Sequence, residues 1–248
     1  MEIRKKLPYI TNNLESVAKK YPKQWESYKA FSEQYPGDCL QMDGIVCPEI
    51  WENQKLKIMT FLKDSYRKKM DKYICTFILD LCNDELFNYN KRKIATWWNL
   101  LKWVNAIRVS LGESEIKDLQ SIAHMNISKL ACDGNESVYT RKGVLSEALD
   151  KDGGLLYQQY KAINPNIVIC GNTYPYFLQL LSKHSNDKLE EKVIFKKSLR
   201  GKEPLYCYLI GRTIVFSAYH PCILNTKPED FQSVISEHKQ EIQEALGI

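Results

Sequence analysis

The sequence predicts an α/β protein: a three-layer α/β/α sandwich with a mostly parallel central sheet, preceded by a helical segment. Two observations lead to this prediction. Short apolar runs with strand character alternate with longer stretches of helical periodicity, as expected where crossovers join parallel strands. The run at residues 166–170, Asn-Ile-Val-Ile-Cys, is continuously apolar after its first residue, which is typical of a strand buried on both faces.

The length and composition fit one domain. The chain has 248 residues, 44% of them hydrophobic, which is enough for a complete core. Residues 10–35 have a helical pattern that falls outside the alternating core. We therefore divide the single predicted domain, 1–248, into an N-terminal helical extension, 1–51, and an α/β core, 52–248.

Each core element has its own local signal. Strands are short apolar runs bounded by turn formers, and helices carry apolar residues at three- and four-residue intervals. Strands are expected at residues 56–62, 121–127 and 166–170, and at 205–210 and 213–218, which form a hairpin about Gly211 and Arg212. Helices are expected at residues 94–107, 141–163, 174–182 and 229–245.

Composition excludes several classes of protein. No stretch of about 18 apolar residues is present, and the first 20 residues carry charges in place of an apolar signal core, so we expect a cytoplasmic protein without a membrane partner. The eight cysteines include no C-x-x-C pair, which favours reduced thiols over a disulfide framework or a metal site. The net charge of +5 is only mildly basic, and for each lysine and arginine cluster a solvated surface is the alternative to a phosphate contact.

Chemically useful residues follow the predicted strands. Asp64 follows the first strand, Asn126 ends the second, Gly171 follows the third and His220 follows the last. Ligands of open parallel sheets bind beyond the carboxyl ends of the strands. We therefore expect a carboxylate, an amide, a tight turn and an imidazole to converge on one edge of the sheet.

Two of these residues suit attack on a base–sugar bond. Asp64 is placed to orient or deprotonate a water that attacks an electron-poor sugar carbon, although a helix cap is an equal alternative. Asn126 offers a donor and an acceptor for the hydrogen-bonding edge of a base, although a loop asparagine is often only a turn former.

His220 precedes Pro221, whose ring restricts the histidine to extended backbone. A rigid neutral imidazole can donate a hydrogen bond to the oxygen of a departing base as negative charge develops there. The other histidines, His124, His184 and His238, have no comparable setting in the sequence. A purely structural histidine is the alternative.

The order of these motifs resembles the uracil-DNA glycosylase superfamily over roughly residues 55 to 245. Strand-Asp64, strand-Asn126 in Asn-Ile-Ser-Lys, the Ile-Val-Ile-Cys-Gly171 unit and His220-Pro-Cys carry the resemblance. It implies a uracil-DNA glycosylase-like fold and a monofunctional glycosylase that flips a base out of DNA and needs no cofactor. Asp64 and His220 would be catalytic, and Asn126 would bind the base.

The resemblance also implies further contacts. Tyr66 is matched to an aromatic residue beside the base, where it would exclude bulky groups at the pyrimidine 5-position. An apolar wedge would come from Ile223 or Leu224. The implied DNA-binding residues are Lys63, Ser128, Lys129, Pro221, Cys222 and Leu224.

The departures from the family pattern indicate a divergent branch. Lys63-Asp-Ser-Tyr66 replaces a glycine- and proline-rich motif, and Cys222 replaces a serine. For such a branch the resemblance implies uracil or another modified pyrimidine as the base, and repair or defence against phage DNA with modified bases as the role. We expect a monomer that binds single- or double-stranded DNA. The alternative is a catalytically inactive nucleic-acid- or protein-binding module on the same fold.

Overall fold

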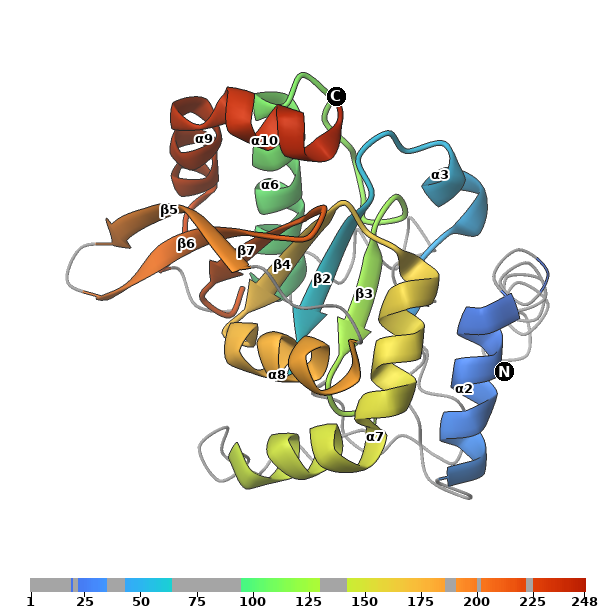
Figure 1. The fold of residues 1–248 in the computed structure, drawn as a ribbon. Coiled ribbons are helices and arrows are strands. Elements are labelled where there is room, and N and C mark those ends of the chain that lie inside the picture. The colour runs from blue at the N-terminus through green and yellow to red at the C-terminus, as the bar shows by residue number, and fades with distance from the viewer. Residues whose placement is uncertain are drawn as a thin grey trace.

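The computed structural model describes residues 19, 22–34, 43–63, 95–129, 142–185, 191–199, 202–221 and 225–248. Within these ranges seven strands form one mixed sheet in the order β1-β3-β2-β4-β7-β6-β5 (Figure 1). The strands are β1 (Gly44–Ile45), β2 (Ile58–Leu62), β3 (Ala123–Asn126), β4 (Ile167–Gly171), β5 (Glu191–Leu199), β6 (Lys202–Ile210) and β7 (Thr213–Ala218).

The centre of the sheet is parallel and its margins are antiparallel. The neighbours β3, β2, β4 and β7 run in the same direction. β1 joins β3 antiparallel at one margin, and β6 and β5 extend the sheet antiparallel beyond β7 at the other. The predicted α/β class with a mostly parallel central sheet is confirmed.

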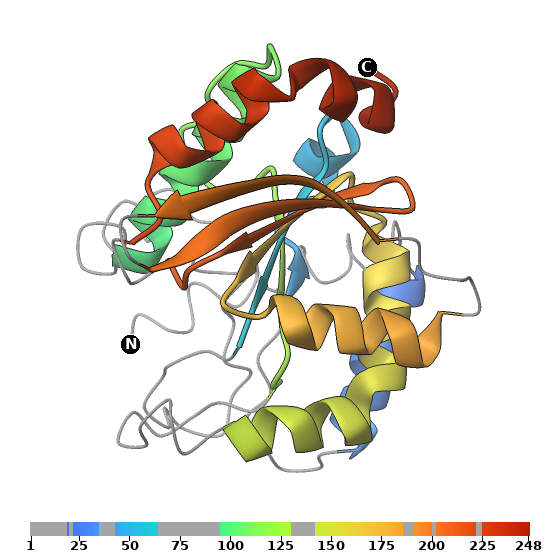
Figure 2. The ribbon, with the colours of Figure 1, turned by 60° about the vertical axis from the view of Figure 1, so that its left-hand side comes forward.

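Helices cover both faces of this sheet (Figures 1 and 2). One face carries α6 (Ala95–Ser110), α9 (Pro228–Glu237) and α10 (Lys239–Leu246). The other carries α7 (Lys142–Ile163) and α8 (Tyr174–His184), and α2 (Pro22–Gln34) packs against α7. The short α3 (Pro48–Glu52) connects β1 to the approach to β2. None of the helices in these ranges is long and apolar enough to cross a membrane.

Alternate residues of the central strands enter two separate cores. On β2, Ile58 and Leu62 pack in the cluster with α6 and α9, whereas Met59 and Phe61 pack in the cluster with α7 and α8. Because both faces are covered, every residue of β2 and β4 is buried. This explains the continuous apolar run from which β4 was predicted.

The predicted elements of the core are present with small shifts at their ends. The hairpin of β6 and β7 turns at Gly211, whose φ of 60° favours glycine. The predicted helix at residues 229–245 is two helices, because the backbone leaves helical geometry at His238, where φ is −127°. Neither β1 nor β5 was predicted. β1 lies inside the range 1–51 that the sequence assigned to a helical extension, so part of that range belongs to the sheet.

Candidate functional site

The carboxyl ends of the four parallel strands meet at one edge of the sheet. The register pairs Leu62 of β2 with Asn126 of β3, so these two strands end level. β4 and β7 also end level, because Gly171 pairs with Ala218. His220 follows two residues after the end of β7. The structure therefore places Asn126, the Gly171 turn and His220 at the same edge.

Gly171 allows these loops to approach one another closely. A Cβ atom on this residue would overlap with Leu62 Cδ2 and would lie 3.0 Å from Pro221 Cδ and 3.6 Å from the His220 Cα. Real Cβ atoms need more room than this. The missing side chain at the end of β4 thus brings the His220–Pro221 segment against the end of β2.

The segment that carries His220 is anchored from two sides. The amide Nδ2 of Asn99 on α6 donates to the Pro221 carbonyl at 2.6 Å, and both residues are buried. The Tyr219 N–H donates to Thr226 Oγ1 at 3.1 Å, which ties the start of the loop to its far side. His220 itself is half-buried. This anchoring holds its backbone in place while part of the residue stays accessible.

Asn126 lies in a buried polar cluster on the α6 face of the sheet. Its side chain is inside the fold, with 1% of the residue exposed. Its Oδ1 lies 3.1 Å from His124 Nε2, and His124 Nδ1 lies 2.5 Å from Thr60 Oγ1. Thr60 and His124 face each other across β2 and β3. Within the described residues, Asn126 Nδ2 is buried and has no hydrogen-bond partner.

The contacts of His124 fix its proton. An amide Oδ1 can only accept, so Nε2 must carry the hydrogen, and Nδ1 then accepts from the Thr60 hydroxyl. Burial lowers the pKa of His124 to about 4, and the charge of His220 acts in the same direction. The ring is therefore neutral near pH 7. It holds the acceptor end of the Asn126 amide, and the donor end has no partner among the described residues.

Asp43 holds the same asparagine through its backbone. The Asp43 carboxylate accepts from the Asn126 N–H at 2.6 Å, from Lys129 Nζ at 2.7 Å and from Gln159 Nε2 at 2.8 Å. Lys129 Nζ also donates to the Asn126 carbonyl at 2.9 Å. Both backbone polar groups of Asn126 are thus fixed by one buried ion pair. We call Asp43, Thr60, His124, Asn126, Lys129 and Gln159 the β3 polar network.

Lys129 has a different environment from the one predicted. It was predicted as a phosphate contact, but only 3% of it is exposed, and its ammonium points at Asp43 and over the Phe31 ring. Burial lowers the pKa of this ammonium, with the Asp43 charge acting in the opposite direction. An ammonium held this way supports the Asn126 loop, and its burial argues against contact with a DNA backbone.

Lys63 and Ser128 lie side by side, where β2 and β3 end. The Ser128 N–H donates to the Lys63 carbonyl at 2.9 Å, continuing the strand pairing by two residues. Ser128 is buried and Lys63 is half-buried. Of the two predicted phosphate contacts, Lys63 is the more accessible.

The remaining predicted site residues cannot be placed. Asp64, Tyr66, Cys222 and Leu224 lie outside the described residues. Their roles stay predictions.

Four residues of the β3 polar network were missed at the sequence level: Asp43, Thr60, His124 and Gln159. His124 was judged to have no special setting, yet it is bonded directly to Asn126. Residues two apart on a strand share a face, so the spacing of His124 and Asn126 was a usable signal. Asp43 gave no such signal, because it lies 83 positions before Asn126.

Fold and site together define an α/β protein with a buried polar network and an imidazole at the carboxyl edge of its parallel strands. No known protein-family model matches this chain, and no curated protein matches it in sequence. Any account of its function therefore rests on the residues themselves.

Proposed function

We propose that the protein is a DNA glycosylase that hydrolyses the N-glycosidic bond of an altered base, as a divergent relative of the uracil-DNA glycosylase superfamily. The observation that carries this proposal is the buried amide of Asn126, whose Nδ2 has no hydrogen-bond partner in the described part of the chain. A buried donor without a partner costs about 1–3 kcal/mol. Such a cost is understandable where a ligand supplies the acceptor.

The orientation of this amide suggests the kind of base. With Oδ1 held by His124, the free end of Asn126 presents only N–H donors. A donor matches a ring carbonyl, as at the 4-position of uracil, and meets another donor at the amino group of cytosine. The proposed substrates are therefore uracil and related bases with a carbonyl at that edge.

His220 is the proposed hydrogen-bond donor to the departing base. It lies at the same edge of the sheet as Asn126, where Gly171 lets the His220–Pro221 segment approach the end of β2. In the proposed reaction the bond between the sugar C1′ and the base nitrogen breaks, and both bonding electrons leave with the base. A neutral His220 donates a hydrogen bond to the base oxygen as charge builds there, and water adds to C1′ and loses a proton. Asp64 is the proposed group that orients this water and accepts its proton, and the departed base anion takes up a proton in turn.

The arrangement of strands supports a glycosylase-like fold for this chain. All of the placed candidate residues come from the carboxyl ends of parallel strands, the region where such sheets bind ligands. Gly171 brings the ends of β2, β4 and the His220 loop together, as a compact pocket for one base requires.

The test is release of free base from a panel of DNAs that contain uracil, other altered bases and bulky modified cytosines. We expect release by the wild-type protein and strong loss in Asp64→Ala, Asn126→Ala and His220→Ala. No release from any substrate, with DNA binding retained, would favour the catalytically inactive module.

A sharper variant reverses the hydrogen-bonding edge. Asn126→Asp keeps an acceptor for His124 and replaces the free donor with an oxygen, so we expect preference to move from carbonyl-bearing to amino-bearing bases. Asn164→Asp makes the same chemical change at an exposed turn with φ of 48°, far along the chain from the site. This control variant should keep the wild-type preference.

A further inference from the structure

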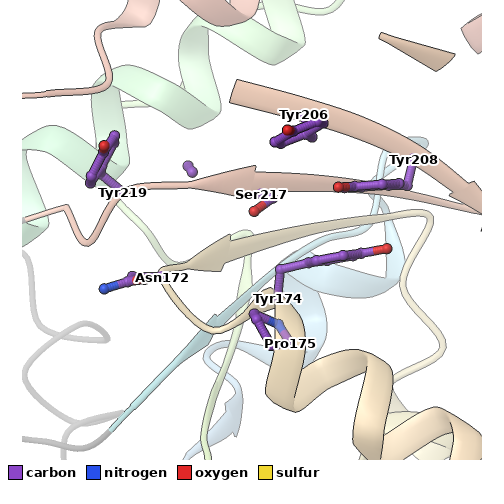
Figure 3. A pocket seen from close by; sticks show the side chains of 8 residues that line it. Asn172, Tyr174, Pro175, Tyr206, Tyr208, Ser217 and Tyr219 are labelled. Atoms are coloured by element: carbon purple, nitrogen blue, oxygen red, sulfur yellow. The ribbon is translucent and has the colours of Figure 1, made fainter. Parts of the chain in front are cut away.

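A pocket lies at the same edge of the sheet, on the face that α7 and α8 cover. It has a volume of about 250 Å³ and is built by the start of α8, by β6 and by the end of β7 (Figure 3). Tyr174 and Tyr208 belong to the core cluster of α7 and α8, and Tyr206 packs against that cluster. The side chains of Thr60, His124 and Asn126 lie on the α6 face, whereas Asp43, Lys129 and Gln159 extend the β3 polar network towards α2 and α7. No residue of this network lines the tyrosine pocket.

Three tyrosine rings form one side of this pocket. Tyr174 and Tyr208 are stacked, with centroids 4.2 Å apart and planes within 6°. Tyr206 and Tyr208 are stacked less closely, at 5.6 Å and 21°. Figure 3 shows the three rings lying roughly parallel, with Ser217 between them and the side of the pocket formed by Asn172 and Tyr219. Tyr206 is half-buried, so this ring has a part that a ligand can contact.

The other side of the pocket borders the candidate active site. Asn172 directly follows Gly171, and Tyr219 directly precedes His220; both line the pocket. The Asn172 N–H donates to the Ala218 carbonyl at 2.7 Å, so the two lining segments are bonded to each other. A strand of nucleic acid that places one base near Asn126 and His220 would therefore pass this pocket.

The chemistry of the pocket fits a neutral planar ring. The described residues that line it carry no charge, which disfavours a phosphate as the group bound inside. Parallel aromatic rings favour a further flat ring, and the Asn172 amide and Ser217 hydroxyl offer hydrogen bonds to its edge. The volume of the pocket suits one base and excludes a stacked duplex.

We propose that this tyrosine pocket binds an unpaired nucleobase that flanks the target nucleotide on the same DNA strand. The inference rests on the proposed function and adds to it a preference for single-stranded over double-stranded DNA. A base inside the pocket has left its neighbours in the duplex, which costs unstacking energy. Single-stranded DNA avoids that cost, so it is the preferred substrate.

The experiment measures binding of a short fluorescein-labelled thymidine oligonucleotide by anisotropy, with full-length protein and no target base. A matched set carries one abasic residue at successive positions. We expect Tyr206→Ala to weaken binding about 5- to 150-fold, the range that loss of one stacked base gives. Tyr206→Phe should bind like wild type. So should Tyr157→Ala, which removes a half-buried tyrosine of α7 that does not line the pocket.

The decisive result is energetic coupling between the Tyr206 ring and one base of the oligonucleotide. In the wild type, one abasic position should weaken binding as much as Tyr206→Ala does, and in Tyr206→Ala that same position should have no further effect. Equal binding by wild type and Tyr206→Ala, or an abasic effect that persists in the variant, overturns the proposal. So does the absence of DNA binding. No bond is broken in this assay, so it is independent of the base-release assay. Coupling between Tyr206 and one base without release of any base would support the pocket proposal and contradict the glycosylase proposal. Base release without this coupling would support the glycosylase proposal and contradict the pocket proposal.

Discussion

The two halves of the carboxyl edge hold their side chains by different interactions. At β3, an ion pair between Asp43 and Lys129 and a chain of hydrogen bonds through His124 fix a single amide. Around β4, β7 and β6, close packing at Gly171 and stacked tyrosine rings shape the surface instead. Hydrogen bonds are directional and select one pattern of donors and acceptors, whereas ring faces accept any base. The comparison suggests selective recognition at β3 and tolerant stacking beside it.

The largest expected effect comes from breaking the ion pair in the β3 polar network. Asp43→Ala leaves the buried Lys129 ammonium without its carboxylate, so we expect the free energy of unfolding to fall by about 3–5 kcal/mol. Denaturation in urea measures this change. The double variant Asp43→Leu with Lys129→Met removes both charges and should lose less. A greater loss in the double variant would show that the cost of Asp43→Ala does not come from leaving the charged Lys129 buried without its carboxylate.

Acid should weaken the same half of the edge through His124. The native pKa of about 4 lies below the ordinary value of 6.5, so the unfolded chain binds more protons between these two pH values. Stability contributed by the neutral ring is present above pH 6.5 and is lost as the pH falls towards 4, by about 3 kcal/mol in all.

Stability curves of His124→Gln and His238→Gln between pH 4 and pH 7 check this expectation. The slope should flatten in His124→Gln, and His238→Gln is the control for exchanging a histidine at a more exposed position between α9 and α10. An unchanged slope in His124→Gln would mean that another group titrates in that window.

In the other half, packing should matter more than charge. Gly171→Ala forces a methyl group against Leu62 and the anchored Pro221 ring, so we expect a loss of about 1–3 kcal/mol in stability. Gly154→Ala in α7 is the matched control, because its Cβ would meet no atom within 4 Å and alanine favours helix. The control should be neutral or stabilising. Equal losses in both variants would contradict the close approach at Gly171.

The smallest effect should come from an exposed pair of the same two residue types. Lys183 and Asp150 join α8 to α7, with about half of each side chain exposed. Solvent screens such a pair, so Lys183→Ala should change the free energy of unfolding by less than about 0.5 kcal/mol. Thermal or urea unfolding measures the difference from Asp43→Ala. Similar losses in the two variants would remove burial as the reason for the strength of the β3 network.

The sequence was most informative where periodicity is strong. β2, β4 and α6 were predicted from apolar patterns that burial in the two cores requires. β5 was missed because its sequence is rich in lysine, which is common in the outermost strand of a sheet. β1 has only two residues, which is too short for any pattern to show.

The candidate site was predictable only in part. Asn126 and His220 could be placed at the carboxyl edge from the sequence, because Asn126 ends β3 and His220 lies two residues after β7, and both strands have clear apolar patterns. Asp43 and Lys129 could not be paired from the sequence, because a buried ion pair across 86 positions leaves no periodic signal. For the same reason Lys129 was assigned to the surface. Burial decides what a lysine does, and burial depends on the assembled fold.

The most direct test of the central claim is release of free base from single-stranded DNA containing uracil, compared with the same strand containing cytosine, by wild type, Asn126→Ala and Asn126→Asp. We expect wild type to release uracil and not cytosine, Asn126→Ala to release neither at a comparable rate, and Asn126→Asp to reverse the preference. Equal uracil release by all three proteins would contradict the account, because the side-chain amide of Asn126 would then have no part in recognising the base.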